Sequence, residues 1–151
     1  MIFLDTDLFV IDLRYRRDAK YTQNRLFLEK ATASSLATTS IFNLLEVCGI
    51  LSFNLNRQQL YELFRYLPQH YNLKLDFSLA PSQRLPLLTL GRMMEIISQK
   101  VSFGDSLIIY AVMQHSQPLT HFVSWNAKHY NSRLNIPALT PAEALATIQY
   151  F

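Results

Sequence analysis

The chain has 151 residues, of which half are hydrophobic and 17% are charged, with only three glycines and six prolines. A chain of this size buries about two-thirds of its unfolded surface, and this composition excludes disordered, collagen-like and low-complexity proteins. The formal net charge of +3 is compatible with a polyanionic partner but does not require one. We expect one domain covering residues 1–151.

The N-terminal segment and the single cysteine indicate the compartment. Cys48 is the only cysteine, so no disulfide can form within the chain. The apolar N-terminus has no basic region before it and is interrupted by Asp5 and Asp7, unlike a secretory signal peptide. No apolar run approaches the roughly 18 residues of a membrane span. We therefore expect a cytoplasmic protein with no membrane partner.

Hydrophobic patterns predict the elements in chain order. Short apolar runs closed by polar residues predict strands, at residues 1–4, 36–39, 120–124 and 139–140. Alternation of apolar and polar residues predicts a half-exposed strand at residues 73–77. Helical periodicity and capping residues predict helices, at residues 8–14, 20–33, 41–51, 57–70, 86–99, 105–115 and 141–149. This alternation predicts an α/β fold with a mostly parallel sheet of four to five strands.

Three carboxylates occupy apolar surroundings. Asp5 ends the first strand, Glu46 lies within an apolar helix, and Asp105 opens another apolar helix. A carboxylate in a low-dielectric environment is costly unless it is paired, protonated or bound to a metal. Hard oxygen ligands suit Mg²⁺ or Mn²⁺, which can generate a hydroxide nucleophile for phosphodiester hydrolysis.

Each acid also has an ordinary structural interpretation. Asp105 could be a helix N-cap before Ser106, and Asp5 could be a turn residue at the end of a strand. Glu46 could point to solvent or pair with an arginine. Asp7 is better interpreted as a helix N-cap than as a metal ligand. The order Asp, Glu, Asp at this spacing is what favours a shared site.

Four blocks of the chain resemble the PIN-domain family. They are an apolar strand followed by Asp-Thr, a polar pair before a helix that carries Glu, an Asp and a small residue at a helix start, and a strand followed by an amide and an aromatic residue. They lie at residues 2–7, 39–46, 104–111 and 121–130. The resemblance covers roughly residues 1 to 150.

The resemblance implies a Rossmann-like, three-layer α/β/α sandwich and a Mg²⁺- or Mn²⁺-dependent endoribonuclease. Asp5, Glu46 and Asp105 match the metal-binding acids, and Thr6 and Ser40 match the polar groups that support them. Many small bacterial members are toxins of type II toxin–antitoxin pairs and form homodimers. An RNA substrate, an antitoxin protein and a second copy of the chain are thus the partners that the resemblance implies.

Asn126 departs from the family pattern. It stands where many members carry a fourth acid, and we expect it to act with the three acids as a catalytic residue. An amide can coordinate a metal but brings no negative charge, so a second metal site should be weak. Nearby, Trp125, Lys128 and Tyr130 could contact RNA, although aromatic core residues beside a solvated lysine are at least as compatible with the sequence.

Basic residues also cluster near the N-terminus. They are interleaved with Tyr15 and Tyr21 and comprise Arg14, Arg16, Arg17, Lys20, Arg25 and Lys30. A solvated helix face with ion pairs to Asp12, Asp18 and Glu29 is favoured over a rim that contacts phosphate.

Two other functions remain open. A domain that has lost catalysis could bind RNA or protein, and Asn126 is the main support for that interpretation. The opening Asp5-Thr6-Asp7 also resembles haloacid-dehalogenase-like phosphatases, in which the first Asp is a nucleophile. That alternative would leave Glu46 without a role, and Phe9 departs from its pattern.

Overall fold

The computed structural model describes residues 1–148 and contains a parallel sheet of four short strands. The strands lie in the order β2-β1-β3-β4 and comprise β1 (Ile2–Leu4), β2 (Ala37–Thr38), β3 (His121–Val123) and β4 (Ala138–Leu139). All three pairings are parallel. The predicted α/β class is therefore confirmed, with four strands in the described part of the chain.

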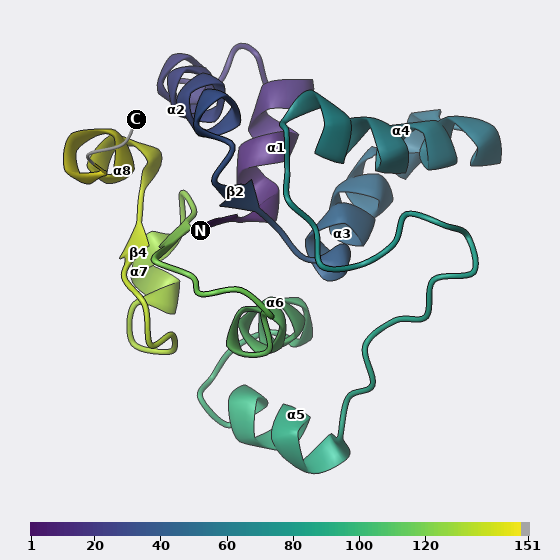
Figure 1. The fold of residues 1–151 in the computed structure, drawn as a ribbon, viewed down its shortest axis with the longest axis vertical. Coiled ribbons are helices and arrows are strands. Elements are labelled where there is room, and N and C mark those ends of the chain that lie inside the picture. Colours follow the sequence, from purple (N-terminus) through teal and green to yellow (C-terminus); the bar gives the residue numbers. More distant parts are fainter. Residues whose placement is uncertain (149–151) are drawn as a thin grey trace.

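Helices pack on both faces of this sheet (Figure 1). Ile2 and Leu4 point to one face and Phe3 to the other, because successive side chains of a strand alternate. The first face is covered by α1 (Thr6–Arg14), α2 (Tyr21–Ser34), α3 (Ile41–Leu51), α4 (Arg57–His70) and α8 (Pro141–Thr147). The second is covered by α5 (Leu90–Ile97), α6 (Phe103–Met113) and α7 (Ala127–Tyr130). This arrangement is consistent with a three-layer α/β/α fold.

The apolar core is divided by the sheet. On the second face the rings of Phe3 and Phe122 stack with their centres 5.6 Å apart. The two residues are paired in neighbouring parallel strands, which places their side chains next to each other. On the first face Phe9 and Tyr71 lie 5.0 Å apart. Full burial of each such aromatic side chain stabilises the fold by about 2–3 kcal/mol.

Local sequence signals explain several helix starts. Asn56 and Gln59 form a capping box at the start of α4, and Thr140 and Glu143 form another at α8. Ser40 caps α3 as predicted. The short 3₁₀ helix η1 (Ser52–Asn54) follows α3. The predicted end of the last helix, at residue 149, lies outside the described residues.

The connection between α4 and α5 differs from the prediction. The sequence predicts a strand at residues 73–77, but the structure has no strand there. The helix predicted at residues 86–99 is shorter in the structure, where it is α5 (Leu90–Ile97). The N–H of Lys74 does donate to the carbonyl oxygen of Ala37 at 2.9 Å, but the Lys74 carbonyl accepts from the Thr38 hydroxyl instead of from a backbone N–H. This segment therefore follows the edge of β2 without extending the ladder.

None of the helices described is both long and apolar enough to cross a bilayer.

Candidate active site

The candidate site begins where two central strands end. Leu4 pairs with Val123, and the N–H of Asp5 donates to the Val123 carbonyl oxygen at 3.0 Å. Asp5 and Ser124 are the first residues beyond these strands, at the edge where parallel sheets commonly bind ligands. The structure places Asp5 at this edge, as the strand pattern predicts.

Asp5 is buried and held by two donors. Its Oδ1 atom accepts from the N–H of Thr6 at 2.8 Å and from Nδ2 of Asn43 at 3.1 Å. Burial and the nearby charge of Asp7 raise the pKa of Asp5 well above its usual value, and the nearby Ser124 hydroxyl and the Thr6 N–H only partly oppose this. Asp5 is also the N-cap of α1.

Glu46 lies between the starts of α1 and α6. Its Oε2 atom accepts from the Thr6 hydroxyl at 2.5 Å. A Cβ at Gly104 would lie 3.7 Å from its Oε1 atom, so α6 approaches this carboxylate closely. Glu46 is exposed and forms no ion pair with an arginine in residues 1–148. Of its two ordinary interpretations, solvent exposure fits the structure.

Asp105 is not the N-cap of α6, and that interpretation is wrong. Ser102 takes this position, and its hydroxyl accepts from the Asp105 N–H at 3.1 Å. The hydroxyls of Ser102 and Tyr130 each donate to the Asp105 carboxylate at 2.8 Å, and His129 Nε2 lies 3.3 Å from Oδ2. Partial burial opposes ionisation, but the hydrogen bonds from Tyr130 and Ser102 outweigh it and lower the pKa of Asp105.

Asp7 has a different role from the predicted helix cap. It lies in the first turn of α1, and its Oδ2 atom accepts from the Ser124 hydroxyl and the Trp125 N–H, both at 2.9 Å. Its Oδ1 atom is buried without a hydrogen-bond partner in the described structure. Burial raises the pKa of Asp7 to about 6 despite these hydrogen bonds. Asp7 thus joins α1 to the loop after β3.

Asn43 was not identified from the sequence. This fully buried amide accepts from the Ser40 hydroxyl at 2.5 Å and donates from Nδ2 to both Asp5 and the Thr6 hydroxyl, each at 3.1 Å. It therefore orients Asp5 from α3. The signal available was its position, one turn before Glu46 on the same helix.

Asn126 lies in the loop next to Asp7, but its side chain is exposed. Its backbone N–H donates to the Ser124 hydroxyl at 2.9 Å. In this structure the Asn126 backbone, through this hydrogen bond, stabilises the loop that holds Asp7.

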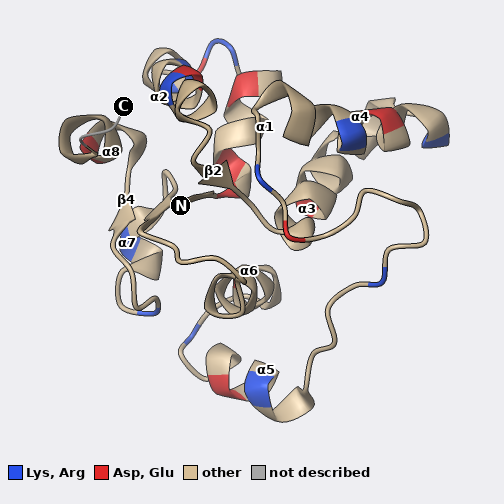
Figure 2. Cartoon of the chain, viewed as in Figure 1, with Lys and Arg blue, Asp and Glu red and all other residues tan. Residues whose placement is uncertain are grey.

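The aromatic and basic residues nearby divide between core and surface. Tyr130 is buried and Lys128 is exposed, as the core interpretation predicts. Trp125 donates from its indole to Asn24 at 2.8 Å, and Lys20 Nζ lies 5.3 Å from its ring. Figure 2 shows further basic residues in the connection between α1 and α2. Arg25 of α2 forms the predicted ion pairs with Asp12 and Glu29, whereas the predicted pair with Asp18 is absent from residues 1–148.

The site gathers carboxylate, hydroxyl and amide oxygens from α1, α3, α6 and the loop after β3. In the conformation described, no three His, Cys, Asp or Glu side chains of residues 1–148 come close enough together to hold a metal ion. Asp105 is turned toward Ser102, Tyr130 and His129. The unpartnered Oδ1 of Asp7 and the mutual repulsion of Asp5 and Asp7 are nevertheless features that a cation would relieve. Comparisons of the chain with family models, with curated proteins and with solved structures return no match.

Proposed function

We propose that this chain is a metal-dependent endoribonuclease with a PIN-like fold. The observation that carries the proposal is the buried Asp5, which lies beyond the end of β1 with Asp7 and Glu46 as acidic neighbours. Repulsion among acids at the end of a central strand costs stability, and the cap that Asp5 provides for α1 does not require further acids beside it.

In this proposal Asp5, Glu46 and Asp105 would hold Mg²⁺ or Mn²⁺, with Asp7 as a further acidic group at the site. When bound, the ion would supply a water of lowered pKa and offset negative charge on the phosphate. Asn43 orients the Asp5 carboxylate, and Thr6 orients the Glu46 carboxylate, each through a hydrogen bond. Asn126 stays a candidate catalytic residue.

Features beside the acids fit an RNA substrate. Lys20 lies over the Trp125 ring, and Arg16 and Arg17 are exposed in the same connection. Cations there can contact phosphates, and a half-buried indole can stack on a base. A role as a toxin with an antitoxin partner, a homodimer and a cytoplasmic location belong to the same proposal through the PIN resemblance.

A second candidate is a PIN-like binding module without catalysis. The observation that favours it is the engagement of Asp105 by Ser102, Tyr130 and His129, which leaves this carboxylate bonded within the protein. The exposed amide of Asn126 in place of an acid points the same way.

Calorimetric titration with Mn²⁺ separates the two functions. We expect the native chain to bind Mn²⁺, and Asp5→Asn and Asp105→Asn to lose binding, because each removes one charge with little change in volume. Asp18→Asn is the matched control, since Asp18 is exposed in the connection before α2 and Asn retains its acceptor for the Lys20 N–H.

The same four proteins are then incubated with a fluorescently labelled single-stranded RNA and Mn²⁺. Cleavage by the native chain and by Asp18→Asn, but not by Asp5→Asn, is the expected result. If Asp5→Asn fails to fold, Glu46→Gln replaces it, because Glu46 is exposed. No Mn²⁺ binding at millimolar metal, or cleavage unaffected by these substitutions, would overturn the nuclease proposal in favour of the binding module.

A further inference from the structure

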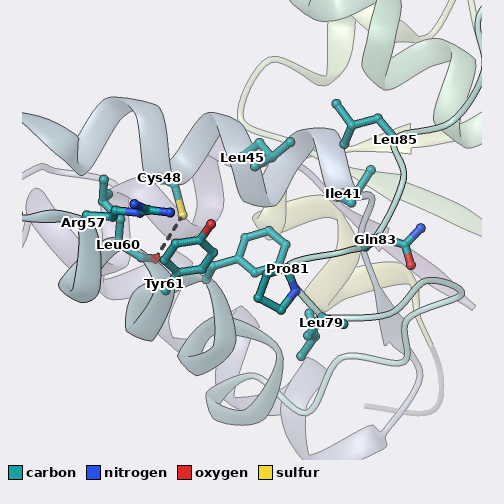
Figure 3. A pocket seen from close by; sticks show the side chains of 12 residues that line it. Ile41, Leu45, Cys48, Arg57, Leu60, Tyr61, Leu79, Pro81, Gln83 and Leu85 are labelled. Atoms are coloured by element: carbon teal, nitrogen blue, oxygen red, sulfur yellow. Dashed lines mark hydrogen bonds between the residues drawn. The ribbon is translucent and has the colours of Figure 1, made fainter.

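An apolar pocket lies between α3, α4 and the segment of residues 79–85. Its volume is about 390 Å³, within the range of roughly 300–1,000 Å³ that is usual for small-molecule sites. Figure 3 shows Arg57 and Tyr61 at one end of it and Gln83 and Leu85 at the other. The two ends of the pocket therefore differ in chemistry, with a guanidinium at one and an amide and an aliphatic side chain at the other.

Most of its wall is aliphatic or aromatic. The apolar side chains come from all three segments and include Ile41, Leu45, Leu60, Phe64, Leu79 and Leu85. Cys48 also lines the wall, with its Sγ atom 4.0 Å from the Leu60 carbonyl oxygen. A lining of this kind, with few polar groups, is typical of sites for apolar ligands.

Arg57 gives this pocket a charged end. It is the single charged residue among the described residues that line the pocket, and it forms no ion pair within residues 1–148. Its guanidinium carbon lies 6.0 Å from the centre of the Tyr61 ring, a contact that orients the side chain. The Tyr61 hydroxyl lies at the same end of the pocket.

The position of Arg57 does not help its helix. Arg57 is the first residue of α4, which is already capped by Asn56 and Gln59. A cation in the first turn opposes the helix dipole and is slightly unfavourable. The guanidinium instead presents positive charge at this end of the pocket, which is complementary to an anion.

We propose that this pocket binds a small amphipathic carboxylate, with its head group on Arg57 and its apolar chain between α3 and residues 79–85. A planar guanidinium fits a carboxylate with two parallel hydrogen bonds. At roughly 30 Å³ per water-sized group, the pocket accommodates about a dozen non-hydrogen atoms. Decanoate has a matching size and is the probe for the test.

The single cysteine makes the pocket measurable. Cys48 lines its wall and is the only thiol of the chain, so its alkylation by N-ethylmaleimide reports on the pocket alone. We expect decanoate, below its micellar concentration, to slow alkylation. At ten times its dissociation constant it leaves about one-tenth of the pockets free, so the rate falls about tenfold. Decylamine, with a similar chain and the opposite charge, should not slow it.

Two exposed arginines of α4 provide the matched variants. Arg57→Gln should abolish the protection by decanoate, whereas Arg65→Gln, outside the pocket, should retain it. Calorimetric titration of the three proteins with decanoate gives a second measurement that does not depend on the thiol. Absence of binding by both methods, equal protection by decylamine, or unchanged binding by Arg57→Gln would each overturn the proposal. None of these outcomes depends on the acidic site.

Discussion

The hydroxyl of Thr6 donates to Oε2 of Glu46 at 2.5 Å and accepts from Nδ2 of Asn43 at 3.1 Å. This single side chain joins the first residue of α1 to two residues of α3, which are 37 and 40 positions away in the sequence. The threonine that follows Asp5 therefore fixes how two acid-bearing helices meet at the end of β1.

Thr6→Val should destabilise the protein by about 1–2 kcal/mol, since it removes a partly buried hydrogen bond to a charged group without changing the side-chain shape. Urea unfolding measures this loss, with Thr22→Val on the exposed face of α2 as the control. A double-mutant cycle with Glu46→Ala, which removes the acceptor, should give a coupling energy of about 0.5–1.5 kcal/mol. We expect the lower part of this range because Glu46 is exposed. Additive effects would show that the bond contributes nothing.

Asn43→Asp should destabilise the metal-free protein strongly at pH 8. The substitution places a second buried carboxylate against Asp5, where Asn43 now donates at 3.1 Å. An unpaired buried charge costs about 3 kcal/mol or more, and protonation at lower pH should restore part of it. Thermal unfolding in EDTA at pH 5 and pH 8 tests this against Asn54→Asp, an exposed control in η1. Equal losses in the two variants would contradict the buried contact.

Asp7 should make the metal-free protein more stable at mildly acidic pH. Its pKa is raised from 3.8 to about 6 in the folded state, so the folded state binds more protons than the unfolded state in this interval. The stabilising contribution is present below pH 3.8 and is lost as the pH rises through about 6. A shift of this size corresponds to at most about 3 kcal/mol.

The measurement for Asp7 is chemical denaturation in EDTA between pH 5 and pH 8. The native chain should lose stability across this range, and Asp7→Asn should show a flatter profile because the titrating group is gone. The difference between the two curves reports the Asp5–Asp7 pair, because Asp7→Asn also removes the charge that raises the pKa of Asp5. Parallel curves would show that Asp7 is not the group responsible.

The sequence was sufficient for the sheet and for most helices. The apolar run before Asp5 and the run before Ser124 mark the two central strands, and Ser40 and Thr140 mark helix starts. These signals are local, because burial of a strand and capping of a helix depend on neighbouring residues.

The sequence did not predict the features that depend on contacts between residues far apart in the chain. Both Asp5 and Asp7 are residue types that favour the N-cap position, and Asp5 takes it. The Asp5 N–H donates to the carbonyl oxygen of Val123, which holds the Asp5 backbone in an extended conformation beside β3. Asp105 lost its predicted cap position to Ser102, three residues earlier. Residues 73–77 alternate between apolar and polar types as in a strand. The Thr38 hydroxyl, however, donates to the Lys74 carbonyl oxygen, which in a β-ladder would accept from a backbone N–H. The role of Asn43 likewise depends on residues about 40 positions away.

Tyr71→Phe should destabilise the fold by about 1–3 kcal/mol, because a buried hydrogen bond to a charged group is lost. The Tyr71 hydroxyl donates to Oδ2 of Asp12 at 2.7 Å, and Arg25 pairs with the same carboxylate at 3.2 Å. Burial is the main cause that raises the pKa of Tyr71, with the bond to Asp12 adding to it. Without the phenol, the buried Asp12 would retain Arg25 as its one side-chain partner within residues 1–148.

Tyr66→Phe is the matched control for this prediction. Tyr66 lies on α4, is 45% exposed and stacks on His70, a contact that a phenylalanine ring preserves. Urea unfolding of the two variants should therefore show a clear loss for Tyr71→Phe and a change within about 0.5 kcal/mol for Tyr66→Phe. Equal stabilities would mean that Arg25 alone compensates the buried Asp12, and that the Tyr71 hydroxyl does not stabilise the packing of α1 against the end of α4.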